Sequence, residues 1–122
     1  MSLKVNLEAQ FSRFSETWSP KIIADLDDYH IKLTRLDGDF PWHAHGDADE
    51  MFYILDGQLR MEFRDRTEAL APGELIVIPK GTLHRPIADK GEVKVLLIEK
   101  ASVVNTGDGP VNARTKAAER LV

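Results

Sequence analysis

The chain has 122 residues, the length of one domain that can bury a hydrophobic core. Its formal net charge of −4 argues against a nucleic-acid partner, and the absence of cysteine excludes disulfides and thiolate ligands. No run approaches about 18 apolar residues, and the N-terminus has no apolar core typical of a signal peptide. We therefore expect a cytoplasmic protein without a membrane segment.

The N-terminal segment carries large apolar side chains at helical spacing, namely Leu7, Phe11, Phe14 and Trp18. Pro20 follows this series and is a residue at which helices commonly stop. The spacing predicts a short amphipathic helix over about residues 5–18. We expect it to pack against the rest of the domain or against a partner subunit.

From residue 21 onward the pattern favours short strands, predicted at residues 21–26, 29–36, 51–55, 58–64, 75–78 and 93–98. The Asp56-Gly57 pair predicts a two-residue hairpin turn. Leu75–Ile78 is apolar throughout and is predicted to be a buried strand. Several short strands separated by turn residues indicate an all-β barrel or sandwich, followed by an irregular tail over about residues 105–122.

Three of the four histidines form one pattern with a glutamate. If residues 43–45 are extended, His43 and His45 point to the same side, and a short polar loop can return Glu50 to the same point. His84, in a second strand-like segment, would complete the set. Such nitrogen and oxygen donors bind a divalent transition metal (Fe, Mn, Ni or Zn) with coordination positions left open. The residual positive charge would favour a small anionic or oxygen-bearing molecule.

The residues around these donors resemble the two sequence motifs of the cupin superfamily. The matching flanking positions are Gly38, Gly57, Gly73, Pro79 and Gly81. Ala88 stands where the second motif ends in Asn, a position that is not a metal ligand in the family. The resemblance covers roughly residues 29–100.

The resemblance implies a single cupin domain over residues 1–122. Its fold would be an all-β cupin-type barrel, also called a double-stranded β-helix or jelly roll, with the barrel core over about residues 21–100. It further implies one metal per chain, held by the histidines and glutamate near the middle of the barrel. Cupins commonly cover their sheet edges by pairing, so a homodimer is also expected.

Other residues near the donors are assigned by their place in the pattern. Phe52 and Ile54 share the strand parity of Glu50, so we expect both to line a mostly apolar pocket around the metal. His30 is interpreted as a structural histidine. Asp47 and Asp49 are interpreted as turn-forming residues rather than catalytic acids.

Two classes of function remain open from the sequence. The first is a metal-dependent enzyme with oxygenase-type or isomerase-type chemistry on a small oxygenated molecule. No second general base stands out beside the donors, which counts mildly against isomerisation. The alternative is a non-catalytic module that binds a small molecule or a metal in the same pocket. A scaffold with an empty site is disfavoured because all four donors are present.

Overall fold

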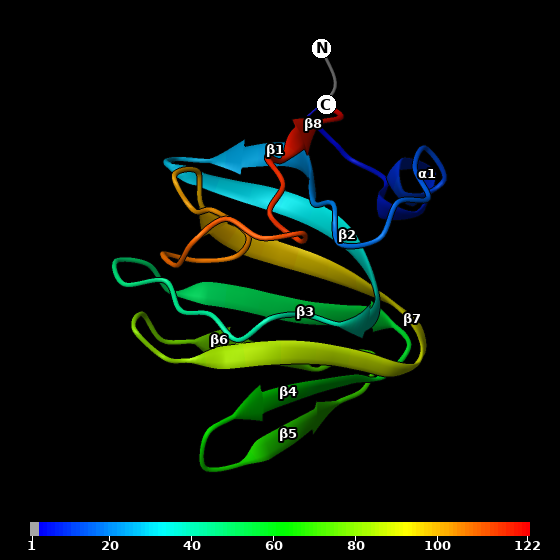
Figure 1. Ribbon diagram of the computed structural model, residues 1–122. Coiled ribbons are helices and arrows are strands. Elements are labelled where there is room, and N and C mark those ends of the chain that lie inside the picture. The colour runs from blue at the N-terminus through cyan, green and yellow to red at the C-terminus, as the bar shows by residue number, and fades with distance from the viewer. Residues whose placement is uncertain (1–2) are drawn as a thin grey trace.

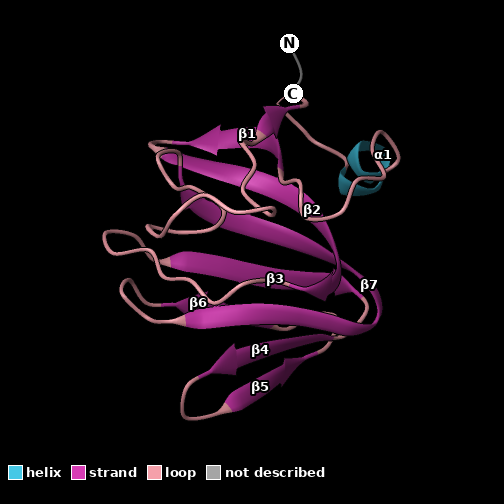
Figure 2. Cartoon of the chain, viewed as in Figure 1, coloured by secondary structure: helices cyan, strands magenta, loops and turns pink. Residues whose placement is uncertain are grey.

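The computed structural model describes residues 3–122 as a curved β-structure with one short helix near its N-terminus (Figures 1 and 2). The elements in chain order are α1 (Leu7–Phe11), β1 (Lys21–Leu26), β2 (Tyr29–Asp39), β3 (Glu50–Asp56), β4 (Leu59–Phe63), β5 (Thr67–Leu70), β6 (Leu75–Ile78), β7 (His84–Lys100) and β8 (Glu119–Arg120). Within this part of the chain, no helix has the length and apolar character needed to cross a membrane.

The strands form one sheet that folds over on itself. Hydrogen bonding runs in the order β5-β4-β7-β2-β1-β8, and β3 joins from the side by pairing with β7 and β6. The long strand β7 belongs to both layers, because its first part pairs with β4 and the end of β2, and its second part pairs with β3 and the rest of β2. The expected all-β fold is confirmed, although the hydrogen bonds among residues 3–122 leave the sheet open rather than closed into a barrel.

The strand register sets out which side chains share the inner face. Glu50 of β3 lies opposite Glu99 of β7, which lies opposite His30 of β2. Lys32 and Thr34 follow His30 on the same face of β2, because alternate residues of a strand point to one side. The inner face is therefore polar at one end, next to the start of β3.

The N-terminal helix is shorter than predicted over residues 5–18. It starts at a side-chain cap from Asn6, which accepts a hydrogen bond of 2.9 Å, and it ends at Phe11. Phe11 and Phe14 pack on the outer face of the sheet, whereas Trp18 packs in the cluster on the inner side. The helical spacing was misleading because these apolar residues serve two different packing surfaces.

The predicted hairpin at Asp56-Gly57 is wrong. β3 pairs with β6 and β7, whereas β4 pairs with β5 and β7, so the turn joins two strands that do not pair. Gly57 has a φ of 86°, and a Cβ there would lie 2.6 Å from the backbone oxygen of Glu92. The left-handed glycine serves instead as the corner where the chain passes from one layer to the other.

The strand β6 is an edge strand rather than a buried one. It pairs only with β3, and its side chains alternate between the interior and solvent. Leu75 is 56% exposed and Val77 is 51% exposed, while Ile78 is buried. An all-apolar sequence therefore did not mean burial on both faces here.

The C-terminal tail is irregular except at its end, which corrects the prediction of an irregular segment over residues 105–122. Glu119 and Arg120 form β8, which pairs in parallel with β1. The Arg120 guanidinium also binds the carboxylate of Asp25 at 2.9 Å. Figure 1 shows the tail in orange, crossing the same end of the fold as the loop before β3.

Candidate metal centre

The four predicted metal ligands lie together in the interior. Each offers one donor atom, and these atoms all lie within 4.8 Å of one another. Glu50 Oε1 is 3.5 Å from His45 Nε2 and 3.4 Å from His84 Nε2. The ring centroids of His43 and His84 are 4.3 Å apart. All four residues are buried, with at most 7% of their surface exposed.

Three segments bring these side chains to one point. Glu50 is the first residue of β3 and His84 is the first residue of β7. His43 forms an isolated bridge with His84, in which each backbone N–H donates to the other residue's carbonyl at 3.0 Å. His45 lies in the loop beyond this bridge, where its carbonyl accepts a hydrogen bond of 2.7 Å from Gly81.

The expected regular strand through residues 43–45 is therefore absent, since only His43 takes part in pairing. The rings of His43 and His45 nevertheless converge, with centroids 5.2 Å apart. A single bridge and one loop contact replace the strand geometry that we used to predict this convergence. The prediction that the two rings approach each other was right, and its structural reason was wrong.

Backbone carbonyls fix which nitrogen of two histidines faces the centre. His43 Nδ1 lies 2.9 Å from Pro41 O and His84 Nδ1 lies 2.8 Å from Thr82 O. A carbonyl only accepts, so Nδ1–H donates in both rings, and in the neutral form of each ring the lone pair is then on Nε2. This is the arrangement in which a neutral imidazole binds a metal through Nε2.

The donor atoms fit a metal ion because they have no other partner. His45 Nε2, His84 Nε2 and Glu50 Oε1 are buried and make no hydrogen bond to any part of residues 3–122. Buried polar atoms are normally paired, since leaving one unpaired costs about 1–3 kcal/mol. Three such atoms at one point could all be satisfied by one shared cation.

The electrostatics of the centre also suit a metal. Burial and repulsion from His84 lower the pKa of His43 to about 4, so this imidazole is neutral at pH 7. Burial alone would raise the pKa of Glu50, but the neighbouring Glu99, His45 and His84 side chains hold it well below the usual range. Neutral imidazole and anionic carboxylate are the protonation states that metal binding requires.

The C-terminal tail holds the loop that carries the ligands, a contact that sequence reasoning missed. The backbone N–H of Asp108 donates to Ala44 O at 3.0 Å, and the Asp108 carboxylate accepts from the Gly46 N–H at 2.6 Å. Gly107 has a φ of 78°, and a Cβ there would lie only 2.4 Å from Ala44 O. The Gly107-Asp108 pair was the one available signal, but it also suits any turn.

A small cavity of about 30 Å³ adjoins the donors and is lined by His43 and Glu50. Its walls are mostly apolar, from Trp18, Leu36, Phe40, Phe52 and Leu97. Phe52 is among the residues that line this cavity. Ile54 is not, because it lies further along β3 opposite Val95, where it is fully buried in the core.

The polar residues set aside in the sequence lie outside the donor set. The ring of His30 faces Asp25, with His30 Nε2 3.5 Å from Asp25 Oδ1. Asp49 Oδ1 accepts a hydrogen bond of 2.9 Å from the Lys80 N–H, so it ties the loop before β3 to the turn before β7. It was predicted to form a turn, and its carboxylate instead bonds to a residue 31 positions away.

Sequence and structure comparisons agree on the family. The Cupin domain family matches residues 33–99, which is more than half of the chain. This family match agrees with the donor set and the open β-fold. The chain belongs to the cupin family.

Several proteins are similar to this chain. The uncharacterized protein YdbB of Bacillus subtilis is 36% identical over 86 residues, covering 70% of this chain and 76% of that protein. A solved cupin-2 domain protein of Shewanella frigidimarina superimposes with a TM-score of 0.77 at 44% identity, covering 79% of this chain and 93% of that one. An acireductone dioxygenase of Tuber melanosporum is 32% identical over 84 residues, or 65% of this chain, and this chain spans 45% of that enzyme.

Proposed function

We propose that this protein binds one divalent transition metal through His43, His45, Glu50 and His84. The observation that carries the proposal is the convergence of three buried, unpartnered donor atoms within the described chain. The three imidazoles and one carboxylate form a set that suits Fe, Mn, Ni or Zn. A bound ion of this kind supplies a Lewis acid or, with Fe, Mn or Ni, a redox centre.

The protein's own residues orient this centre and restrict access to it. The carbonyls of Pro41 and Thr82 hold the rings of His43 and His84 with Nε2 facing inward. Phe40 packs edge-on against His43, with ring centroids 5.1 Å apart, and so excludes water from one side of the donors. The centre is therefore preorganised, which reduces the ordering needed when a ligand binds.

We further propose that the protein is a metal-dependent enzyme acting on a small oxygenated molecule. Oxygenase-type chemistry is supported by the similarity to an acireductone dioxygenase, although this chain spans less than half of that enzyme. Isomerase-type chemistry needs an acid or base beside the metal. Glu99, which lines the cavity, is a candidate for that role that the sequence motifs did not reveal.

The alternative is a binding module that captures a small molecule without turnover. The cavity of about 30 Å³ does not distinguish the two functions, because a substrate and a captured ligand would need the same side-chain movement to enter it. The two functions share the metal and differ in whether a product forms.

Metal titration followed by ligand challenge tests the proposal. Metal-free protein should gain thermal stability with at least one of Fe²⁺, Mn²⁺, Ni²⁺ and Zn²⁺, because an ion that binds only the folded state stabilises it. Glu50→Gln should lose this gain, since it removes the charged donor but keeps the side-chain shape. His30→Gln is the matched control and should keep it. Absence of any metal response in the wild-type protein would refute the proposal.

Oxygen uptake by the iron-loaded protein then separates the two functions. An oxygenase consumes O₂ when a suitable small oxygenated molecule is added, and His84→Ala abolishes that consumption while the fold persists. A binding module shows ligand-dependent thermal stabilisation with neither O₂ consumption nor a new product. The same assay thus identifies which of the two proposals is wrong.

A further inference from the structure

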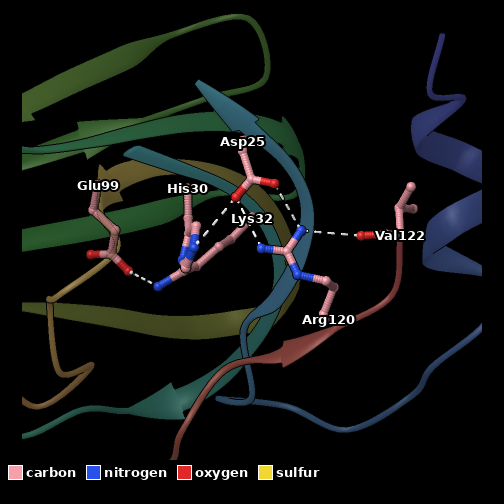
Figure 3. A network of polar contacts seen from close by, with 6 residues as sticks. All are labelled: Asp25, His30, Lys32, Glu99, Arg120 and Val122. Carbon is pink, nitrogen blue, oxygen red and sulfur yellow. Dashed lines mark hydrogen bonds and ion pairs between the residues drawn. The ribbon is translucent and has the colours of Figure 1, made fainter. Parts of the chain in front are cut away.

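A buried ion pair lies beside the metal centre and is not part of the donor set. Lys32 Nζ of β2 is 2.8 Å from Glu99 Oε1 of β7, and the two side chains are 4% and 1% exposed. Figure 3 shows Lys32 reaching across the inner face to Glu99. Glu99 in turn lies directly opposite Glu50 in the strand register, so the pair adjoins the donors.

Stability alone does not explain why this ion pair is buried. Removing two charges from water costs several kcal/mol, and well-packed apolar residues in place of a buried pair are often neutral or stabilising. Only the next row of the same face is apolar, with Phe52 opposite Leu97, whereas His30 and Glu50 flank Glu99 in its own row. A charged pair kept in such surroundings points to a role in binding.

Glu99 has binding capacity that the ion pair leaves unused. Its Oε1 accepts from Lys32, but its Oε2 is buried and has no partner in the described part of the chain. Thr34 Oγ1 is also buried and has no hydrogen-bond partner in the described part of the chain, and the residue is only 1% exposed. Both residues line the cavity that His43 and Glu50 also line.

These two unpaired groups restrict the chemistry of the ligand. A hydrocarbon group would leave both of them unsatisfied, at a cost of about 1–3 kcal/mol each. A carboxylate group of the ligand at this place would be repelled by the neighbouring Glu50 carboxylate. A hydroxyl group can both donate and accept, so it can satisfy a carboxyl oxygen or a threonine hydroxyl without adding charge.

We propose that Glu99 and Thr34 form a second polar anchor in the cavity, which recognises a hydroxyl group of a small oxygenated ligand. Another oxygen of the same ligand faces the metal centre, so the inference rests on the proposed metal-dependent function. Lys32 does not touch the ligand; it is a positioning residue that holds the Glu99 carboxyl group in place. The predicted substrate class is small molecules that carry a hydroxyl group in addition to a metal-binding oxygen.

The experiment compares two probes that differ by one hydroxyl group, 3-hydroxypropanoate and propanoate. Their dissociation constants are measured by the visible spectrum of protein loaded with Co²⁺, and metal content is determined for every sample. Wild-type protein should bind the hydroxylated probe about tenfold more tightly, as expected for one additional hydrogen bond. Because the probe's hydroxyl could also contact the metal, the deciding quantity is how this preference changes in the variants.

Two variants remove the anchor in different ways. Thr34→Val keeps the shape and all charges, and the double variant Lys32→Met/Glu99→Met replaces the ion pair by apolar side chains. Both variants keep all four metal donors, so both should bind Co²⁺. Both should lose most of the preference for the hydroxylated probe. Thr34→Val keeps the test decisive if the double variant fails to fold. Arg120→Gln, which removes an exposed ion pair on the neighbouring strand, is the control and should keep the preference.

The outcomes separate this inference from the proposed function. Equal binding of the two probes by wild-type protein, or an unchanged preference in both variants, would overturn the second anchor and leave the metal centre standing. Loss of metal from the double variant would show that Glu99 holds Glu50 in place for metal binding. That result would also overturn the second anchor. Wild-type protein that binds no Co²⁺ would overturn the proposed function and this inference together.

Discussion

At the scale of single residues, backbone contacts decide how the donors face. The carbonyls of Pro41 and Thr82 each accept a hydrogen bond from the Nδ1–H of the histidine two residues later. In the neutral form of each ring, the lone pair is therefore on Nε2. Neither carbonyl contact changes the ligand set that the motif predicts. Their effect is to fix ring rotation, which determines whether the donors can converge on one ion.

Gly107 offers a residue-scale test of how the tail holds the ligand loop. Gly107→Ala should lower the free energy of unfolding by about 1–3 kcal/mol, because it adds a Cβ 2.4 Å from Ala44 O at a residue with positive φ. Metal affinity should fall as well, since Ala44 lies between His43 and His45. Urea unfolding and metal titration measure the two effects.

Gly109→Ala is the matched control for this prediction. No atom lies within 4 Å of a Cβ built at Gly109, and its φ is outside the left-handed region. Its stability and metal affinity should therefore stay close to wild type. Equal effects of the two substitutions would show that the contact with Ala44 has no special importance.

At the scale of elements, the strand β7 connects the two halves of the site. Its first residue, His84, is a donor, and Glu99 near its end lies beside Glu50 of β3. The strand reaches both places because it bends and pairs with β4 in one layer and with β2 and β3 in the other. One continuous strand thus contributes a donor to the metal centre and a residue to the proposed second anchor.

The segment between α1 and β1 is anchored by an ion pair whose effect should depend on pH. The hydrogen bond from Lys21 to Glu16, at 2.7 Å, lowers the pKa of the Glu16 carboxyl from 4.5 to about 2. A group with a lowered pKa in the folded state stabilises above its unfolded pKa, and this contribution is lost as pH falls. Glu16→Gln should therefore destabilise the protein at pH values above about 4.5 and have a progressively smaller effect toward pH 2.

Urea unfolding of wild-type protein and Glu16→Gln across this pH range measures the difference. Glu16 is exposed, so the difference at neutral pH should be small and should decrease in high salt. A difference that stayed constant with pH would show that the ionised carboxylate contributes nothing.

At the scale of the whole molecule, the cupin fold and the four donors could be predicted from the sequence, and much of their setting could not. The ligand spacing and the motif glycines were sufficient to bring His43, His45, Glu50 and His84 together. The role of Glu99 depends on a strand register that local sequence does not determine. Local sequence also does not determine which strands pair on either side of Gly57. The residues there are typical of a hairpin turn, but they connect strands of different layers.

The tail contacts were unpredictable for a related reason. Asp108 and Gly46 are 62 positions apart, and nothing in the local pattern of either residue indicates the other. Such contacts depend on the path of an irregular segment over the completed sheet. Local patterns can therefore predict which residues carry the chemistry better than they predict which residues hold them in place.

The homodimer expected from the family resemblance stays a prediction, and the edge strand β6 is where we expect it to form. This strand has one unpaired side and exposes Leu75 and Val77. Light scattering should give the mass of a dimer for wild-type protein and of a monomer for Leu75→Lys/Val77→Lys. Leu26→Lys, at another exposed apolar residue, should leave the dimer intact. Monomeric wild-type protein would contradict the prediction.

The most direct test of the metal centre is elemental analysis of protein purified without a chelator, beside the double variant His45→Ala/His84→Ala. We predict roughly one divalent transition-metal ion per chain in the wild-type protein and loss of that metal in the folded variant. Wild-type protein that holds no metal, and that cannot be loaded with Fe²⁺, Mn²⁺, Ni²⁺ or Zn²⁺, would contradict the account.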